Sequence, residues 1–404
     1  SQDTMATFVA DEEALETFSD DVGSLWCRPV AVLDYPPDAF TFLRNFVHPN
    51  VPCIIRNAIK AGDDALRLNL DDIIDRVGED VMLTVDVTPD GHGDCVRNVI
   101  DSSSNITADG KSITTEATRI RQVFVKPHEQ QMSIAEFRRL LRKDYKVDEC
   151  NRRSEEELEA FPIYKNTAES SAADESTNTA TRRRASPVVY YSKQSDCLRT
   201  EMKELFSTNI FPESFLFAEK AFGTGPPDAV NLWIGNERSV SSMHKDFYHN
   251  LFFVCSGQKE FVLNPPADHI FLHEGEFPCA TFTPVEAKEM NDDCDWAVTL
   301  DQDDDEDDSG SDLPKEVTTK WIEPDITIDK SDKFPLLAKA HPMKVLVSEG
   351  EILYIPPLWY HRVTQTCETV GVNYWYDMNF DTPHWCYFNF LQQLSPSQNL
   401  TSKT

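Results

Sequence analysis

Apolar and polar positions alternate in short runs throughout the second half of the chain. From residue 188 onward, runs rich in β-branched and aromatic residues are bounded by Gly, Pro, Asn or Ser, which is typical of β-strands. Closely spaced antiparallel strands of this kind predict a sandwich, a jelly roll or a cupin-like barrel. The expected strands cover residues 188–194, 229–235, 250–255, 258–264, 343–349, 351–357 and 370–377.

Two glycines separate neighbouring runs in this half. Gly257 lies in the sequence CSGQ and Gly350 lies in the sequence SEGE. Glycine adopts the positive φ angles that tight turns need, so we expect both junctions to be β-hairpin turns.

The first part of the chain mixes helical and strand patterns. Ser133 followed by Glu136 has the spacing of a capping box at a helix start. Apolar residues recur at helical spacing in three segments, and two further segments have the composition of strands. The expected helices cover residues 38–47, 68–78 and 132–145, and the expected strands cover residues 51–59 and 81–88.

These patterns predict a mainly β protein with flanking helices, an α+β arrangement around a sandwich, jelly-roll or cupin-like core. One segment has no apolar periodicity and is rich in Ser, Thr and Ala, as expected of a polar linker or insertion. We therefore expect an N-terminal region packed on the core at 1–165, this linker at 166–187, the core domain at 188–394 with an acidic insertion at 287–313, and a tail at 395–404.

The chain is strongly acidic. Its 38 Lys and Arg residues against 69 Asp and Glu residues give a formal net charge of −31, which disfavours direct nucleic-acid binding and suits a basic partner. Residues 291–308 hold ten acidic residues and no basic ones, a composition typical of a solvated loop. The ten cysteines form no CxxC pair and no zinc-finger pattern, so we expect reduced thiols.

Neither a targeting segment nor a membrane segment is expected. The acidic start of the sequence lacks the basic and apolar regions of a signal peptide. A membrane-spanning helix needs a run of about 18 apolar residues, and the sequence has none. We therefore expect a cytoplasmic protein that can also be present in the nucleus, with no membrane partner.

One of the strand-like segments contains two potential metal ligands. His244 and Asp246 are two residues apart, so on a strand they would project to the same face, which in a barrel is the interior. His361, expected at the end of the strand that follows the Gly350 turn, offers a third ligand from another strand. Two histidines and one carboxylate form the facial triad that binds Fe(II) and leaves three coordination positions open.

A buried cation would complement such a metal site. Fe(II) with one carboxylate and two neutral imidazoles keeps a charge of about +1, which suits a dianionic co-substrate that chelates through a carboxylate and a keto oxygen. The far carboxylate of that molecule needs a cation, because a buried unpaired charge costs several kcal/mol. Lys259 follows the next tight turn and can lie in the same barrel.

The motifs around these residues resemble the Jumonji C (JmjC) 2-oxoglutarate oxygenases of the cupin type. The resemblance implies a double-stranded β-helix core of the jelly-roll or cupin type. The similarity is to the small hydroxylases of the family rather than to its multidomain histone demethylases. It runs from about Pro29 to Leu394, with interruptions at residues 150–187 and 287–311. The stretches that carry it are NLWIGNERSVSSMHKDFYHNLFFVCSGQKEFVLNPP, LYIPPLWYHRV and VNYWYDM.

Carried over by position, the resemblance implies Fe(II) ligation by three residues and 2-oxoglutarate binding by six others. Tyr191 competes with Tyr190 for one role, since strand alternation lets only one of the two face inward. Ser241 replaces an expected threonine and keeps the hydroxyl. The implied ligands are His244, Asp246 and His361, and the implied co-substrate residues are Lys259, Tyr190, Ser241, Asn250, Asn373 and Trp375.

The activity implied by the resemblance is hydroxylation of a protein lysine at C3 with Fe(II), 2-oxoglutarate and O2, with ascorbate as an activator. The implied substrates are translation-factor-type GTPases of the developmentally regulated GTP-binding class. An acidic entrance would hold the lysine ammonium, and Asp86, Asp90 and Asp377 lie in shared motifs. Cys27 matches a cysteine that could join two subunits of a homodimer, although a reducing cytosol favours the free thiol.

Two other functions stay open at the level of the sequence. The first keeps the oxygenase and changes the substrate, giving a histone-directed demethylase or a histone-tail peptidase. The second is a cupin that binds metal as a non-catalytic scaffold. The presence of all of His244, Asp246, His361 and Lys259 favours the oxygenase over the scaffold.

Overall fold

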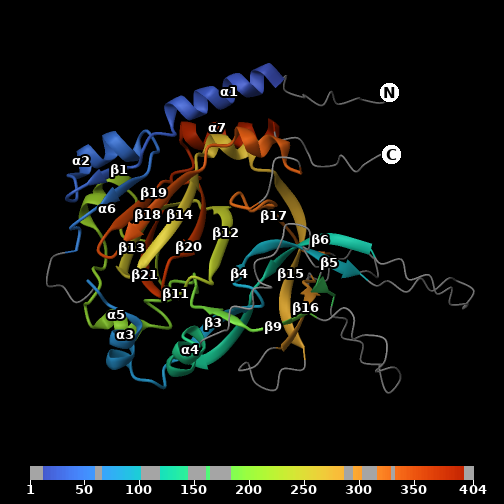
Figure 1. Ribbon diagram of the computed structural model, residues 1–404. Helices are drawn as coiled ribbons and strands as arrows, with labels where there is room; N and C mark the ends of the chain where they lie inside the picture. Colours follow the sequence, from blue (N-terminus) through green and yellow to red (C-terminus); the bar gives the residue numbers. More distant parts are fainter. Residues whose placement is uncertain are drawn as a thin grey trace, which may run out of the picture.

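Two sheets that face each other form the centre of the protein (Figure 1). The computed structural model describes residues 12–59, 66–101, 119–143, 161–163, 183–285, 294–302, 316–328 and 333–394. The central strands are β11 (Ala229–Gly235), β12 (Val240–Lys245), β13 (Tyr248–Ser256), β14 (Gln258–Asn264), β18 (Met343–Ser348), β19 (Ile352–Ile355), β20 (Tyr360–Gln365) and β21 (Thr369–Asp377). Three short strands, β1 (Ala31–Leu33), β2 (Cys53–Ile55) and β4 (His92–Gly93), extend the two sheets.

The chain passes back and forth between these sheets, which is the arrangement of a double-stranded β-helix. One sheet has the order β1-β2-β19-β13-β21-β11 and the other has the order β18-β14-β20-β12-β4. Consecutive strands from β11 to β14, and again from β18 to β21, therefore lie in opposite sheets. The predicted mainly β fold with a jelly-roll core is confirmed.

The two predicted β-hairpins do not form, because the strands on either side of each turn do not pair with each other. Gly257 and Gly350 have the expected positive φ angles, 81° and 84°. However, the first glycine joins β13 to β14 and the second joins β18 to β19, and each pair is split between the two sheets. A local turn signal specifies the backbone angles of a junction, whereas the partner of each strand depends on which face is buried.

The space between the sheets is filled by side chains from both of them. Aromatic and aliphatic residues of β11, β13 and β19 meet those of β14, β18 and β20. Alternate residues of each strand point inward, so a polar residue at an inward position is held in this apolar interior. The fully buried residues of this cluster include Val254, Phe261, Leu263, Val347, Leu353, Ile355 and Trp359.

Helices cover the outer face of the six-stranded sheet. The ring of Phe42 packs against Phe217, Phe222 and Tyr354, which joins the N-terminal helices to β19.

The helical elements are α1 (Glu12–Leu25), α2 (Ala39–Phe42), η1 (Leu43–Val47), α3 (Leu70–Val77), α4 (Ile134–Leu141), α5 (Lys203–Ser207), α6 (Leu216–Phe222), η3 (Pro266–Phe271), η4 (Pro335–Lys339) and α7 (Pro383–Leu394). None of the helices in the described ranges has the length and apolar character needed to cross a membrane.

The predicted helices of the first part of the chain are present with local differences. Ser133 caps α4 by accepting a hydrogen bond from the backbone N–H of Glu136. The capping box with both reciprocal hydrogen bonds lies instead at α3, between Asn69 and Asp72. The expected helix at 38–47 is split into α2 and the π-helical segment η1.

A second group of strands stands beside the barrel and is here named the arm sheet (Figure 1). Its order is β8-β5-β6-β15-β16-β9, with β17 paired to β15. Its strands are β5 (Cys95–Asp101), β6 (Arg119–Lys126), β8 (Phe161–Pro162), β9 (Arg183–Ala185), β15 (Glu274–Val285), β16 (Cys294–Leu300) and β17 (Thr318–Ile322). A separate sheet of β3 (Met82–Thr88), β7 (His128–Ser133) and β10 (Val188–Tyr190) has the order β10-β3-β7.

The arm sheet corrects the interpretation of two polar segments. The range expected to be a solvated acidic insertion contains β16, in which Trp296 is fully buried. The predicted linker contains β9, which pairs with β16. Apolar residues such as Trp296 are few in these acidic or polar ranges. The overall polar composition therefore predicted loops, although both ranges contain a strand. Residues 166–182, 286–293, 303–315 and 395–404 lie outside the described residues.

Candidate metal and co-substrate site

His244, Asp246 and His361 lie together where β12 meets β20. The antiparallel register of these strands places His244 directly opposite His361, and the ring centroids are 4.2 Å apart. Asp246 lies just after the end of β12, and not within the strand as predicted. His361 lies near the start of β20, and not at the end of the strand that follows the Gly350 turn. Its Oδ2 is 3.5 Å from His361 Nε2. One potential ligand atom from each of the three residues falls within 4.8 Å of the others.

The backbone orients both imidazole rings. His244 Nδ1 donates to the carbonyl oxygen of Ser242 over 2.7 Å, and His361 Nδ1 donates to the carbonyl oxygen of Trp359 over 3.0 Å. Each histidine therefore carries its proton on Nδ1 and presents a free Nε2 lone pair to the centre of the cluster.

The electrostatics of the cluster suit a divalent cation. Burial lowers the pKa of His244 to about 4, with a further contribution from His361. Burial alone would raise the pKa of Asp246, but its close contact with His361 and the nearby His244 and Lys245 hold that pKa below its usual value. Ligands that share one ion at bond lengths near 2.1 Å lie about 3 Å apart, and the 3.5 Å between Asp246 Oδ2 and His361 Nε2 is close to this. The three residues fit a facial-triad metal ion.

Lys259 lies in the same interior, and no described residue provides a counter-ion for it. The side chain is 1% exposed, and its Nζ donates to the hydroxyl of Tyr190 over 3.0 Å. The ammonium also lies 4.9 Å from the ring centroid of Phe252. Burial lowers the pKa of Lys259 to about 7, and in the described ranges no acidic side chain is within ion-pair distance. A ligand carboxylate would supply the missing negative charge.

The two candidate tyrosines, Tyr190 at the end of β10 and Tyr191 directly after it, point in different directions. Tyr190 lines the cavity and shares a hydrogen bond with Ser241, which opposes the rise in its pKa caused by burial. Tyr191 packs in the core outside the cavity and donates its hydroxyl hydrogen to Glu201 Oε2 over 2.8 Å. Tyr190 is therefore the tyrosine that can reach a ligand beside Lys259.

Two asparagines and two tryptophans form another wall. Asn373 Nδ2 donates to Asn250 Oδ1 over 3.4 Å, and Trp233 Nε1 donates to Asn373 Oδ1 over 2.9 Å. Trp375 stacks on Tyr248 with centroids 5.0 Å apart. The indole N–H of Trp375 is buried and has no hydrogen-bond partner in the part of the chain that the structure describes. Trp233 was missed by the sequence reasoning, because its strand gives no signal that distinguishes it from a core residue.

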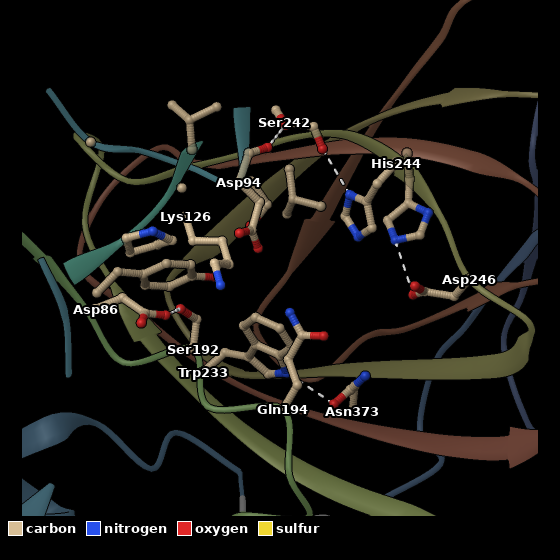
Figure 2. Close-up of a pocket in the computed structure, with 18 of the residues that line it drawn as sticks. Asp86, Asp94, Lys126, Ser192, Gln194, Trp233, Ser242, His244, Asp246 and Asn373 are labelled. Atoms are coloured by element: carbon tan, nitrogen blue, oxygen red, sulfur yellow. Dashed lines mark hydrogen bonds and ion pairs between the residues drawn. The ribbon is translucent and has the colours of Figure 1, made fainter. Parts of the chain in front are cut away.

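All nine predicted site residues line a single cavity of about 330 Å³ (Figure 2). Figure 2 shows His244 and Asp246 at one side of it and Asp86 at the other. The structure thus brings together residues that are far apart in sequence, although their individual roles stay predictions.

Two further carboxylates, Asp86 and Asp94, line the cavity beside the metal cluster. Burial raises the pKa of Asp86 to about 6, against the effect of a hydrogen bond from Ser192. Burial and the nearby charge of Asp86 raise the pKa of Asp94 to about 7. Lys126 lies between these two residues in Figure 2, but its ammonium pairs with Asp301 over 2.7 Å. This end of the cavity would accept an additional cation.

The other two acidic candidates from the sequence do not line the cavity. Asp90 pairs with Arg97 at 2.8 Å, and Asp377 is exposed. Asp94 was not predicted. Its φ angle of 52° and its place after the glycines of GHGD mark a turn, a signal that specifies the backbone but not where the carboxylate points.

A double-stranded β-helix whose interior holds a His-Asp-His cluster and a buried lysine defines the cupin class of 2-oxoglutarate oxygenases. Residues 39–382 match the family model of the cupin-like domain. The chain belongs to this family and, within it, to the JmjC proteins, so the predicted family is confirmed.

The curated relatives are similar over most or about half of the chain. JmjC domain-containing protein E of Dictyostelium discoideum is 29% identical over 410 residues, covering 96% of this chain and 98% of that protein. The human bifunctional peptidase and (3S)-lysyl hydroxylase JMJD7 is 28% identical over 376 residues, covering 93% and 92%. Lysine-specific demethylase JMJ32 of Arabidopsis thaliana is 38% identical over 214 residues, covering 51% and 57%.

Proposed function

We propose that the protein is an Fe(II)- and 2-oxoglutarate-dependent oxygenase that hydroxylates a lysine side chain of a protein substrate at C3. The observation that carries this proposal is the placement of the His-Asp-His cluster and the buried Lys259 in one cavity. Membership of the JmjC family supports the oxygenase. The name of the human relative, which aligns over 93% of this chain, supports the lysyl hydroxylase.

One group of cavity residues would bind the metal, and another would bind the co-substrate. His244, Asp246 and His361 would hold Fe(II), which when bound supplies the redox chemistry that activates O2. Lys259, with the hydroxyls of Tyr190 and Ser241, would bind the far carboxylate of 2-oxoglutarate. The remaining predicted residues, Asn250, Asn373 and Trp375, would form the wall beside the chelating end.

The acidic side of the cavity supports a cationic substrate. A lysine that enters the cavity can place a methylene near the metal cluster and its ammonium near Asp86 and Asp94. The resemblance noted from the sequence extends this to GTPases of the developmentally regulated GTP-binding class. It also suggests a homodimer through Cys27, which the structure describes as a half-buried free thiol.

The test is mass spectrometry of a lysine peptide from such a GTPase after incubation with Fe(II), 2-oxoglutarate and ascorbate. We expect a gain of one oxygen on the lysine, absent with the His244→Ala variant. Succinate formation without a modified peptide would keep the oxygenase and reject this substrate. Absence of both would contradict the oxygenase and favour the metal-binding scaffold.

A demethylase is the second candidate, because the Arabidopsis relative that is 38% identical over 214 residues carries that name. A peptidase is the third, from the name of the human relative. The same spectra separate the three reactions when a methyl-lysine peptide is included. Hydroxylation adds one oxygen, demethylation removes a methyl group, and peptidase activity shortens the peptide.

A further inference from the structure

A tryptophan from the arm sheet contacts the residue that orients His244. Trp321 lies on β17, and its Nε1–H donates to Ser242 Oγ over 2.9 Å. The backbone carbonyl of the same serine accepts the hydrogen bond from His244 Nδ1 over 2.7 Å. The indole ring of Trp321 also lies parallel to the imidazole of His244, with an interplanar angle of 3° and centroids 5.9 Å apart.

The arm sheet holds this serine from two directions. Ser242 Oγ donates to the backbone carbonyl of Asp94, at the start of β5, while it accepts from Trp321. Trp321 is itself packed against Phe124 of β6, with ring centroids 4.6 Å apart. The register of β12 shifts between Ser241 and His244, so regular pairing with β20 does not fix Ser242. The contacts from the arm sheet take the place of that pairing.

The second histidine of the cluster has a comparable arrangement. His361 Nδ1 donates to the carbonyl of Trp359 over 3.0 Å, and the indole N–H of Trp359 donates to the carbonyl of Asn50 over 2.7 Å. Each histidine is therefore oriented by the carbonyl of the residue two positions earlier, and an indole hydrogen bond anchors each of those residues. For His361, the indole is that of Trp359 itself. For His244, the indole that contacts Ser242 is that of Trp321, from the distant strand β17.

We propose that Trp321 is a positioning residue for the metal site, which acts through Ser242 to fix the direction and the tautomer of the His244 imidazole. This inference rests on the proposed metal-binding function and adds to it a residue of the arm sheet. Without the indole N–H, the Ser242 hydroxyl would keep only its hydrogen bond to the Asp94 carbonyl, so the Ser242 carbonyl would be held less firmly and the His244 Nε2 lone pair would be less well directed. Removal of such an outer partner lowers metal affinity by about 10-fold to 100-fold in other metal sites.

Two substitutions test the hydrogen bond from both ends. Trp321→Phe keeps an aromatic ring and removes the N–H, while Ser242→Ala removes the acceptor and keeps the backbone carbonyl. We expect each variant to bind Co(II) roughly 10-fold more weakly than the wild type in calorimetry. The double variant should bind Co(II) no more weakly than Ser242→Ala alone, because the indole N–H of Trp321 has no serine hydroxyl to contact in that variant. The visible spectrum of bound Co(II) should change in each variant.

Trp296→Phe is the matched control. Trp296 is also a tryptophan of the arm sheet, donates its indole N–H to the carbonyl of Ala185 over 3.3 Å and does not line the cavity. We expect its Co(II) affinity to equal that of the wild type even if its melting temperature falls.

The outcomes separate the inference from the proposed function. Folded Trp321→Phe and Ser242→Ala proteins with wild-type Co(II) affinity and spectrum would overturn the positioning role, as would losses that simply add in the double variant. A wild-type protein that binds no Co(II) would overturn the proposed metal site and this inference together.

Discussion

Among single residues, Lys259 is the one whose surroundings say most about the ligand. Its ammonium is enclosed by the rings of Tyr190, Trp233 and Phe252, with one hydrogen bond to a neutral hydroxyl. A charged group in such a place is costly unless a partner neutralises it. The described part of the chain offers no acidic partner, and a ligand carboxylate would supply the complementary charge.

Replacement of Lys259 should remove the co-substrate without removing the metal. Lys259→Met keeps the length of the side chain and loses the charge, so we expect 2-oxoglutarate affinity to fall about 100-fold, or about 3 kcal/mol. Mn(II) affinity should stay at the wild-type value. Calorimetry with Mn(II)-loaded protein measures both quantities.

Lys344→Met is the control for this substitution. Lys344 lies on the neighbouring strand β18, is 63% exposed and pairs with Glu260. The affinity for 2-oxoglutarate should not change in this variant. An equal loss in both variants would show that the loss reflects overall charge and not a contact of Lys259.

The affinity for 2-oxoglutarate should depend on pH around the pKa of Lys259, which burial lowers to about 7. Below pH 7 the free protein already holds the proton that the ammonium needs, so affinity should be constant there. Above pH 7 binding must take up that proton, so affinity should fall by up to about tenfold per pH unit. Calorimetry in two buffers of different ionisation enthalpy measures the proton uptake, and affinity that does not change up to pH 9 would contradict this assignment.

The acidic residues of the cavity should control the choice of substrate and not the handling of 2-oxoglutarate. We expect Asp86→Asn and Asp94→Asn each to raise the KM for a lysine peptide about 10-fold, since each loses an ion pair of about 1.4 kcal/mol. Succinate formation without peptide should be unchanged. Asp377→Asn removes the same charge outside the cavity and should leave the KM unchanged. Equal KM values for all three variants would exclude this role.

At the scale of strands and turns, local patterns predicted where elements lie but not what they pair with. The positions of the core strands β11, β13, β14, β18, β19 and β21 and the positive φ angles of Gly257 and Gly350 followed from the sequence, whereas the strands of the arm sheet did not. The partners did not, because the chain crosses between sheets at both turns. Asp94 and Trp321 escaped prediction for the same reason, since they reach the cavity only through the pairing of the arm sheet.

The crossing between β13 and β14 should be sensitive to a single methyl group. A Cβ at Gly257 would lie 2.5 Å from the carbonyl oxygen of Glu368, in addition to the strain of φ at 81°. We expect Gly257→Ala to lower the free energy of unfolding by about 3 kcal/mol. Urea denaturation followed by tryptophan fluorescence measures this change.

Gly223→Ala separates backbone strain from the clash. Gly223 ends α6 with φ at 74°, and an added Cβ would meet nothing within 4 Å. Only the strain of about 1 kcal/mol should appear there. Equal losses at both positions would mean that the β13–β14 crossing is less tightly packed than described.

For the molecule as a whole, the two facing sheets and the arm sheet meet around one cavity. The family and the mainly β core could be predicted because the metal-ligand and lysine motifs lie in short continuous stretches. The acidic end of the cavity could not, because it is built from the turn before β5 and from β3, which come together only in the folded chain. The central claim is that this cavity binds Fe(II) and 2-oxoglutarate together.

The most direct measurement is an anaerobic titration of the protein with Fe(II) and then with 2-oxoglutarate, followed by visible absorption. We predict a weak charge-transfer band that appears only when both are present. The Asp246→Ala variant should not develop the band, and Lys259→Met should need much more 2-oxoglutarate to do so. A wild-type protein that shows no band with both ligands in excess would contradict the account.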